Sequence, residues 1–249
     1  MGKDSKIAWT DHTFNPWHGC DKVSAGCRFC YAETQTKRWG DNYWGKDAPR
    51  RFMSDKYWAQ PFNWNAKAKK DLKPALVFCG SMCDVFEKRK DLDDARDRLW
   101  NVIGATPWLR WLLLTKRPEN IRDLMPNHAP DQQWYPRVWL GVSVENEKAI
   151  ERVKILTQIP ANVRFISAEP LLESINVAPW LDKISWVIAG GESGKGSRPM
   201  KEEWAKHLLM QCRETDTAFF MKQLGGYPNK RDQMDDFPNG LRIRQFPMD

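Results

Sequence analysis

"RVWLGVSVENEKAIERVKILTQI", residues 137–159, contains one complete strand, loop and helix, and this order of elements decides the fold. The first part is a short apolar run of the kind found in strands buried on both faces. The polar residues Glu145 and Asn146 close the run. Apolar side chains then follow at helical spacing, at Ala149, Ile150, Val153 and Leu156. A buried strand followed by an amphipathic helix is the repeating unit of parallel α/β proteins.

The same pattern recurs along the chain. Five further apolar runs end in polar or glycine-rich residues: "ALVFCGSMCD" (75–84), "WLLLTKRP" (111–118), "VRFISAEPL" (163–171), "SWVIAGGESG" (185–194) and "AFFMKQLGG" (218–226). Helical patterns cover 91–104 and 201–214 as well as 145–159. We therefore predict a parallel β/α architecture, either open or closed into a barrel. A weaker extended segment at 6–17 is expected to supply a strand before these six.

The organisation of the chain points to a single domain over 1–249. Its 249 residues suit one large α/β domain or two small ones, and no Ser/Gly-rich linker divides them. Residues 227–249 are expected to form a tail draped over the domain. No apolar run approaches the roughly 20 residues of a membrane span, and "MGKDSKIAWTD" lacks the apolar core of a secretion signal. We expect a cytoplasmic protein with reduced thiols and no membrane partner.

The net charge of +7 is concentrated in one stretch. Residues 37–73 hold ten Lys or Arg against four Asp, interleaved with eight aromatic residues: Trp39, Tyr43, Trp44, Phe52, Tyr57, Trp58, Phe62 and Trp64. Cations with stacking faces suit a nucleic-acid backbone and unstacked bases. The other interpretation is a solvated helix pair whose aromatic side chains pack inward. Both interpretations remain open at this point.

Polar side chains follow every apolar run, where parallel β/α folds place their chemistry. We expect them to line one mouth of the sheet. They are Ser81, Cys83, Asp84, Thr115, Lys116, Arg117, Ser143, Glu145, Asn146, Ser167, Glu169, Glu192, Ser193, Lys222 and Gln223. Three of them, Glu145, Asn146 and Ser193, are expected only to cap the helices that follow.

Three cysteines lie in "WHGCDKVSAGCRFCYAE" (17–33), spaced Cys20-x6-Cys27-x2-Cys30. Three thiolates can hold three irons of a [4Fe–4S] cluster and leave the fourth iron open to a small ligand. A zinc site completed by His18 is the alternative, because zinc takes four such ligands. Colour separates the two, since a cluster is brown and zinc is colourless. Of the other cysteines, we expect Cys79 and Cys212 to be core residues.

With Phe29 before its last cysteine, the loop resembles the cluster motif of radical S-adenosylmethionine enzymes. The usual motif has three residues in the first gap, whereas this chain has six. The longer gap, together with "SAEPLL", "VIAGGESG" and "FFMKQLGG", resembles a phage-associated subgroup with a three-Cys motif. A smaller likeness, in "SMCD" and "LLLTK", is to spore photoproduct lyase, a DNA-repairing member of the superfamily.

The resemblance implies a partial (β/α)6 TIM-type barrel with mostly parallel strands, a [4Fe–4S] cluster and S-adenosylmethionine as cofactors. It implies cleavage of that cofactor to a 5′-deoxyadenosyl radical, which takes a hydrogen atom from the substrate. The metal ligands would be Cys20, Cys27 and Cys30. The cofactor-binding residues would be Ser81 and Asp84 at its amino group, Lys116 and Ser143 at its carboxylate and ribose, and Gly190 and Gly191 beside its adenine.

Three residues are candidates for catalysis. Glu169 and Glu192 are expected to contact substrate or transfer protons, although Glu169 would alternatively bind cofactor hydroxyls. Cys83 would donate a hydrogen atom to a product radical, or is simply a core residue. The expected reaction is an isomerase- or lyase-type rearrangement or repair of a DNA base or a modified thymine-type nucleotide, which would be flipped out or single-stranded. An electron donor is the further partner required.

Two other functions remain open. One keeps the radical chemistry but acts on a peptide or small metabolite, and DNA binding that weakens steeply with salt would argue against it. The other is a non-enzymatic zinc or cluster protein that binds nucleic acid, and formation of 5′-deoxyadenosine would exclude it.

Overall fold

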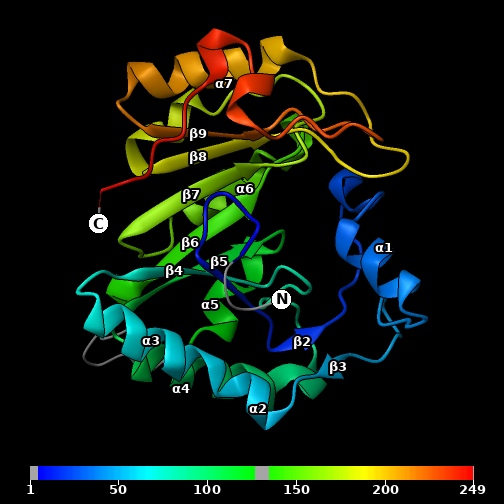
Figure 1. The fold of residues 1–249 in the computed structure, drawn as a ribbon, viewed down its shortest axis with the longest axis vertical. Coiled ribbons are helices and arrows are strands. Elements are labelled where there is room, and N and C mark those ends of the chain that lie inside the picture. Colours follow the sequence, from blue (N-terminus) through cyan, green and yellow to red (C-terminus); the bar gives the residue numbers. More distant parts are fainter. Residues whose placement is uncertain (1–4, 127–134, 249) are drawn as a thin grey trace. The chain divides into compact units, whose positions relative to one another are not determined.

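The computed structural model of the protein describes residues 5–126 and 135–248. Seven strands form one sheet in the order β1-β4-β5-β6-β7-β8-β9 (Figure 1). They are β1 (His12–Phe14), β4 (Ala75–Cys79), β5 (Leu109–Thr115), β6 (Val138–Ser143), β7 (Val163–Ala168), β8 (Trp186–Gly190) and β9 (Ala218–Gln223). The fold is α/β, a partial TIM-type barrel with parallel strands, as predicted. Each of the six predicted runs contains a strand, and the weaker segment supplies β1.

The predicted helices are confirmed, with shifted ends. The helices are α1 (Tyr31–Arg38), α2 (Asp55–Trp58), α3 (Gln60–Lys70), α4 (Asp93–Ala105), α5 (Ile121–Leu124), α6 (Glu151–Leu156) and α7 (Glu202–Glu214). Asn146 does act as a cap, because its side chain accepts a hydrogen bond from Ala149 N at the start of a 3-10 turn that precedes α6. Ser193 does not, because the next helix begins at Glu202 with Lys201 at its N-cap.

The chain divides into two compact units. The first unit comprises Met1–Lys22 and Ala32–Leu140, and the second comprises Val23–Tyr31 and Gly141–Asp249. The boundary falls inside the cysteine loop, so that Cys20 belongs to the first unit and Cys27 and Cys30 to the second. The single domain expected from the sequence stays a prediction.

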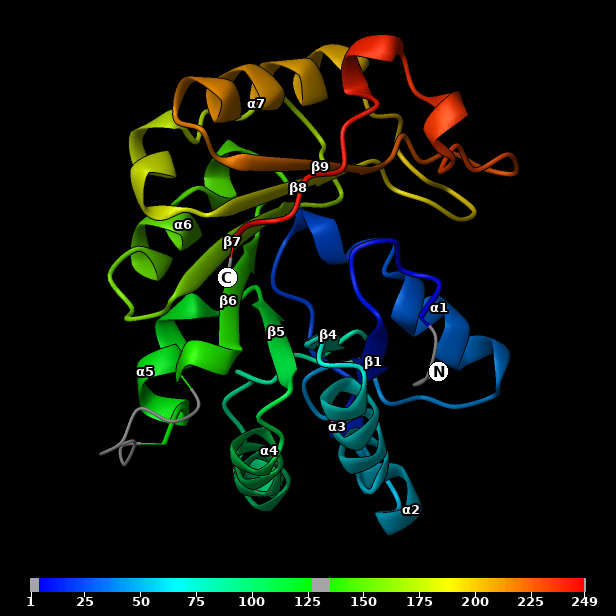
Figure 2. The same ribbon diagram turned by 60° about the vertical axis from the view of Figure 1, so that its left-hand side comes forward.

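In the first unit, β1, β4 and β5 pair in parallel, and α3 and α4 pack side by side (Figure 2). The basic aromatic stretch contributes to this core. Trp58 and Trp64 are buried, and the Trp64 ring stacks on His12 with centroids 4.5 Å apart. A short antiparallel ribbon joins β2 (Trp17–His18) to β3 (Arg51–Phe52). Inward packing therefore accounts for part of the stretch, while Phe52 stays exposed.

In the second unit, β7, β8 and β9 pair in parallel and α7 packs against β8 and β9 (Figure 1). The tail that follows β9 returns along that strand in the opposite direction. Met221 N donates to Ile243 O at 2.8 Å, and Gln245 N donates to Phe219 O at 2.9 Å. Phe237 in the tail is buried, which fixes the returning segment to the unit. No helix in the described part of the chain is long and apolar enough to cross a bilayer.

Candidate functional site

Asp84, just after β4, joins the ends of two strands in the first unit. The carboxylate is buried, and one oxygen accepts from Phe86 N at 3.0 Å and from Thr115 Oγ1 at 2.7 Å. The other oxygen accepts from Lys116 N at 3.1 Å and from Arg117 Nη1 at 3.0 Å. Three of the predicted strand-end residues thus meet at Asp84, as parallel strands require.

Arg117 links this carboxylate to the first cysteine of the loop. Its Nη1 lies 3.5 Å from Cys20 Sγ, and its Nη2 donates to Asp21 O at 2.8 Å. Burial raises the pKa of the Cys20 thiol to about 12; nearby Asp84 acts in the same direction, and Arg117 opposes it. The sequence placed Arg117 at a strand end but assigned it no role. Its position two residues beyond β5 was the only signal.

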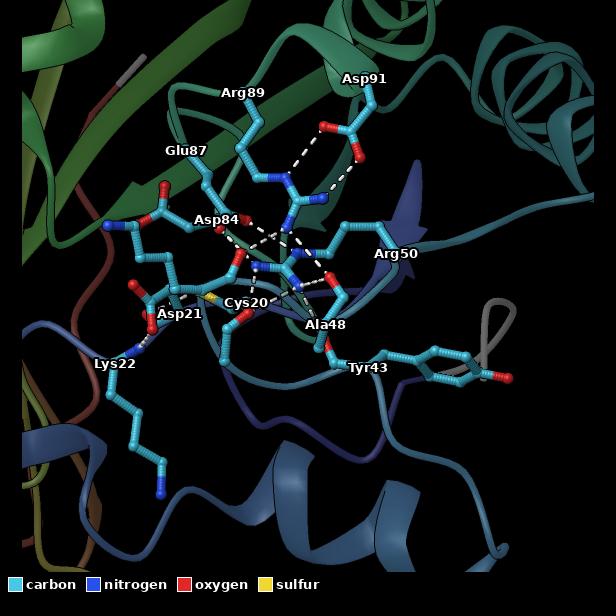
Figure 3. A network of polar contacts seen from close by, with 12 residues as sticks. Cys20, Asp21, Lys22, Tyr43, Ala48, Arg50, Asp84, Glu87, Arg89 and Asp91 are labelled. Atoms are coloured by element: carbon cyan, nitrogen blue, oxygen red, sulfur yellow. Dashed lines mark hydrogen bonds and ion pairs between the residues drawn. The ribbon is translucent and has the colours of Figure 1, made fainter.

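The backbone around Cys20 is held by a buried ion pair that the sequence did not reveal (Figure 3). Cys20 O accepts from Gly45 N at 3.0 Å, so the 43–48 loop lies against the cysteine. Arg50, whose side chain is fully buried, donates to three carbonyls of that loop. Its guanidinium also pairs with Glu87 at 2.6 Å and 3.2 Å. The pair thereby fixes the loop that supports Cys20.

The other predicted residues of the first unit are buried beside this network. Asn15 Nδ2 donates to Ser81 Oγ at 3.0 Å, and Met82 N donates to Asn15 Oδ1 at 2.7 Å. Cys83 packs with Trp17 and with Leu92, and burial raises the pKa of its thiol well above the usual value. Cys79 and Cys212 are core residues, as expected. The roles predicted for Ser81, Asp84, Lys116 and Cys83 stay predictions.

In the second unit, Glu145 at the end of β6 holds the cysteine loop. Its side chain is 1% exposed, and one oxygen accepts from Gly26 N at 3.2 Å. The other accepts from Arg152 Nη1 at 2.9 Å, and the same nitrogen donates to Ser143 O at 2.7 Å. The expectation that Glu145 is only a helix cap is therefore wrong. Its neighbour Asn146 does the capping, which leaves the Glu145 carboxylate to bind the loop.

A second contact to the same loop comes from the segment after β8. Glu192 is buried and accepts three hydrogen bonds from Arg198, from its backbone N, Nε and Nη2. Arg198 Nη2 also donates to Ala25 O at 3.0 Å, and its guanidinium lies over the Phe29 ring at 5.3 Å. Glu145 and Arg198 together hold the part of the loop that carries Cys27.

Glu169 and Lys222 form an ion pair between the ends of β7 and β9. Gly190, at the end of the intervening β8, leaves room for this pair, because a Cβ there would lie 3.3 Å from Glu169 Cδ. A Cβ on Gly191 would lie 2.2 Å from Leu224 O. Both glycines do permit close approach. In the structure the Glu169 side chain approaches Gly190, and the backbone at Leu224 approaches Gly191.

The loop cysteines have the chemistry of cluster ligands. Cys20, Cys27 and Cys30 are partly exposed and form no disulfide, whereas the other three cysteines are buried. Three cysteines outside the core and without a disulfide fit a cluster held at three irons. Within residues 5–126 and 135–248, no three His, Cys, Asp or Glu side chains are gathered so that they could hold a metal ion. The chain thus supplies three candidate thiol donors, although its described residues do not form a ready-made metal site.

The fold and these contacts define an α/β protein of partial-barrel type in which strand-end side chains hold a cysteine-bearing loop. The chain belongs to the family of proteins of unknown function DUF5131, whose family model matches residues 4–244. No curated protein and no solved structure matches the chain significantly.

Proposed function

We propose that this protein is a radical S-adenosylmethionine enzyme that rearranges or repairs a DNA base or a modified, thymine-type nucleotide. The observation that carries the proposal is the loop of three partly exposed cysteines without a disulfide, Cys20, Cys27 and Cys30. These cysteines would hold a [4Fe–4S] cluster, which with S-adenosylmethionine would supply radical chemistry that removes a hydrogen atom from the substrate. The protein would act in the cytoplasm, that of the host if the chain is phage-encoded, with an electron donor as partner.

The side chains around the loop would position its ligands. Arg117 sets a positive charge beside Cys20, which opposes part of the burial that raises the pKa of this thiol. Glu145 and Arg198 fix the backbone at Gly26 and Ala25. Fixed ligands reduce the conformational freedom lost when a cluster and its cofactor bind.

The cofactor would be contacted by the strand-end residues Ser81, Asp84, Lys116, Ser143, Gly190 and Gly191. Asp84 already accepts four hydrogen bonds, so binding the amino group of the cofactor would require it to release one donor. Glu192 is similarly engaged by Arg198. Glu169 is paired with Lys222 and would have to leave this ion pair to contact the substrate.

Anaerobic reconstitution with iron and sulfide tests the proposal. The protein should turn brown, bind iron and sulfide in equal amounts and, with reductant and S-adenosylmethionine, release 5′-deoxyadenosine. Serine at Cys20, Cys27 and Cys30 should abolish the colour, whereas Cys212→Ala, a change in the core, should keep it. A colourless protein that retains no iron would refute the proposal.

Incubation with digested phage DNA, followed by mass spectrometry of the nucleosides, tests the substrate. A new nucleoside that depends on the cofactor supports a DNA base. Formation of 5′-deoxyadenosine without any altered nucleoside points instead to a peptide or small metabolite. In this assay Cys83→Ala should leave cofactor cleavage intact and change the product; an unchanged product would remove Cys83 from the mechanism.

A zinc protein that binds nucleic acid is the second candidate. His18 favours it, because this residue is 9% exposed and its Nδ1 has no hydrogen-bond partner among the described residues. Burial is the main cause that lowers the pKa of His18, which leaves the neutral imidazole that zinc binds. One zinc per chain, lost on His18→Ala, would establish this candidate in place of the radical enzyme.

A further inference from the structure

The exposed aromatic side chains of the first unit are concentrated in its basic stretch. Among the described residues of that unit, four large apolar side chains are exposed, and all four lie between residues 37 and 73. They are Trp39 at 51%, Phe52 at 49%, Phe62 at 45% and Leu72 at 77%. Three of the four are aromatic. The buried Trp58 and Trp64 show that the same stretch also supplies the core, so the exposed rings form a separate set.

Cations accompany each of these rings. Of the ten Lys and Arg in the stretch, all except Arg50 are exposed. Arg38 precedes Trp39 at the end of α1, and Arg51 precedes Phe52 in β3. On α3, Lys69 lies seven residues after Phe62, which puts both on the outward face of the helix. Carboxylates are fewer, and three of the four are engaged in ion pairs: the half-buried Asp41 with Arg51, Asp55 with Arg98 and Asp71 with Lys67.

The ribbon connects this surface to the cysteine loop along the chain. Phe52 pairs with Trp17 and Arg51 pairs with His18, and the strand that holds Trp17 and His18 ends two residues before Cys20. The 43–48 loop between α1 and β3 also contacts Cys20 through Gly45 N. A ligand held on Arg51 and Phe52 would therefore lie on the strand next to the one that enters the cysteine loop.

We propose that this stacking surface, formed by Trp39, Phe52 and Phe62 with Arg38, Arg51 and Lys69, binds single-stranded nucleic acid. Exposed rings stack only on bases that are not already stacked, while the cations neutralise the phosphates between them. A duplex offers the same charge but no free base faces. This inference rests on the proposed function for its biological purpose. A base that undergoes chemistry must first leave the duplex, and a surface that binds single strands would hold it there.

Binding is measured on the metal-free chain by fluorescence anisotropy, with labelled oligothymidylate of about 15 nucleotides. Trp39→Ala and Phe52→Ala should each weaken binding by about 5- to 50-fold, as expected for the loss of one stacked base. The matched control is Tyr227→Ala, which removes a ring of similar exposure, 58%, from the second unit and should leave affinity unchanged. Trp39, Phe52 and Tyr227 are each about half exposed, so removing any of these rings should leave the parent's circular dichroism and urea midpoint unchanged.

A salt titration separates charge from stacking. In single strands each neutralised phosphate contributes about −0.7 to the slope of log K against log salt, so Arg38→Gln with Arg51→Gln should flatten the slope by about 1.4. Lys206→Gln, on the second unit's α7, is the control and should not change it. The aromatic variants should shift affinity at every salt concentration and leave the slope as it is.

Three results would overturn the inference: no binding of the oligonucleotide, equal affinity for a duplex of the same length, or aromatic variants that bind like the parent. Because no cluster is present, these results are independent of the radical chemistry. Binding without 5′-deoxyadenosine formation in the reconstituted protein would refute the proposed function alone. Formation of 5′-deoxyadenosine without binding would refute the stacking surface alone.

Discussion

Replacing Glu145 with Gln should loosen the cysteine loop while leaving the rest of the second unit folded. The carboxylate is almost completely buried and holds two groups, Gly26 N at 3.2 Å and Arg152 Nη1 at 2.9 Å. Glutamine keeps the shape and one carbonyl oxygen but loses the charge. The two contacts use different carboxylate oxygens, so the amide oxygen can keep only one of them, while the NH2 group meets the other donor and Arg152 loses its ion-pair partner.

The size of the effect follows from these two contacts. A hydrogen bond to a charged group contributes about 1.5–3 kcal/mol, against about 1 kcal/mol for a neutral one. The bond to Gly26 should therefore weaken by about 0.5–2 kcal/mol. Because about 1.4 kcal/mol corresponds to a tenfold change in an equilibrium, the loop should open about 2- to 30-fold more often.

Two measurements on the metal-free chain report this opening. Hydrogen exchange should lose protection at the Gly26 amide by that factor, and a thiol reagent should modify Cys27 and Cys30 faster by a similar factor. Glu151→Gln is the control, because that side chain is 64% exposed and its pairing with Lys154 spans 3.4 Å, a contact worth less than about 1 kcal/mol. Unchanged exchange at Gly26 and unchanged thiol reactivity in Glu145→Gln would refute the role given to this carboxylate.

Three further changes test the packing and charge described above. Glu87→Gln should lower stability to urea by about 3 kcal/mol, because it leaves the Arg50 guanidinium buried without a counter-charge, and an unaltered midpoint would contradict this. Gly141→Ala should cost about 1–3 kcal/mol, since its Cβ would lie 2.2 Å from Phe165 Cζ; adding Phe165→Leu should restore part of the loss, and no restoration would count against this contact. At Glu33, burial raises the pKa, but hydrogen bonds from Lys22 and Lys37 outweigh this effect and lower the pKa below 4.5. The ionised carboxylate therefore stabilises the fold above pH 4.5, and this stabilisation is lost as the pH falls through the lowered pKa. Glu33→Gln should therefore be less stable than the parent by about 0.5–1 kcal/mol at neutral pH and equally stable in acid. Urea midpoints of both proteins measured at neutral and acidic pH test this, and a stability difference that is the same at both would contradict it.

The elements with a strong local signal could be predicted from the sequence. Six apolar runs of four or five residues became strands, and the periodic segments around α4 and α7 became helices, because burial and periodicity act over neighbouring residues. The meeting of Asp84 with Thr115 also followed from the rule that parallel strand ends share an edge.

The side chains that hold the cysteine loop could not be predicted, because their partners are distant in sequence. Arg117 meets Cys20 across 97 residues, and Arg198 meets Ala25 across 173. No local pattern distinguishes such an arginine from one in solvent. Glu145 was assigned to the wrong role for a related reason, because the residue beside it carries a genuine capping signal.

The basic stretch shows a different limit. Its alternating aromatic and charged residues are compatible with a packed helix pair and with a binding surface, and composition alone does not separate them. The structure assigns Trp58 to the core and leaves Trp39 in solvent. That division depends on which face of each short helix meets the sheet, which is set by tertiary packing.

The returning tail has a practical consequence for handling the protein. Strand β9 is the last strand of the sheet, and its outer amide and carbonyl groups are occupied by Ile243 and Gln245. An uncovered outermost strand is a template on which further copies can add, so the tail acts as a guard against polymerisation. A shortened chain that ends at residue 226 would present bare peptide groups along β9, so a protein prepared for crystallisation should keep residues 227–248.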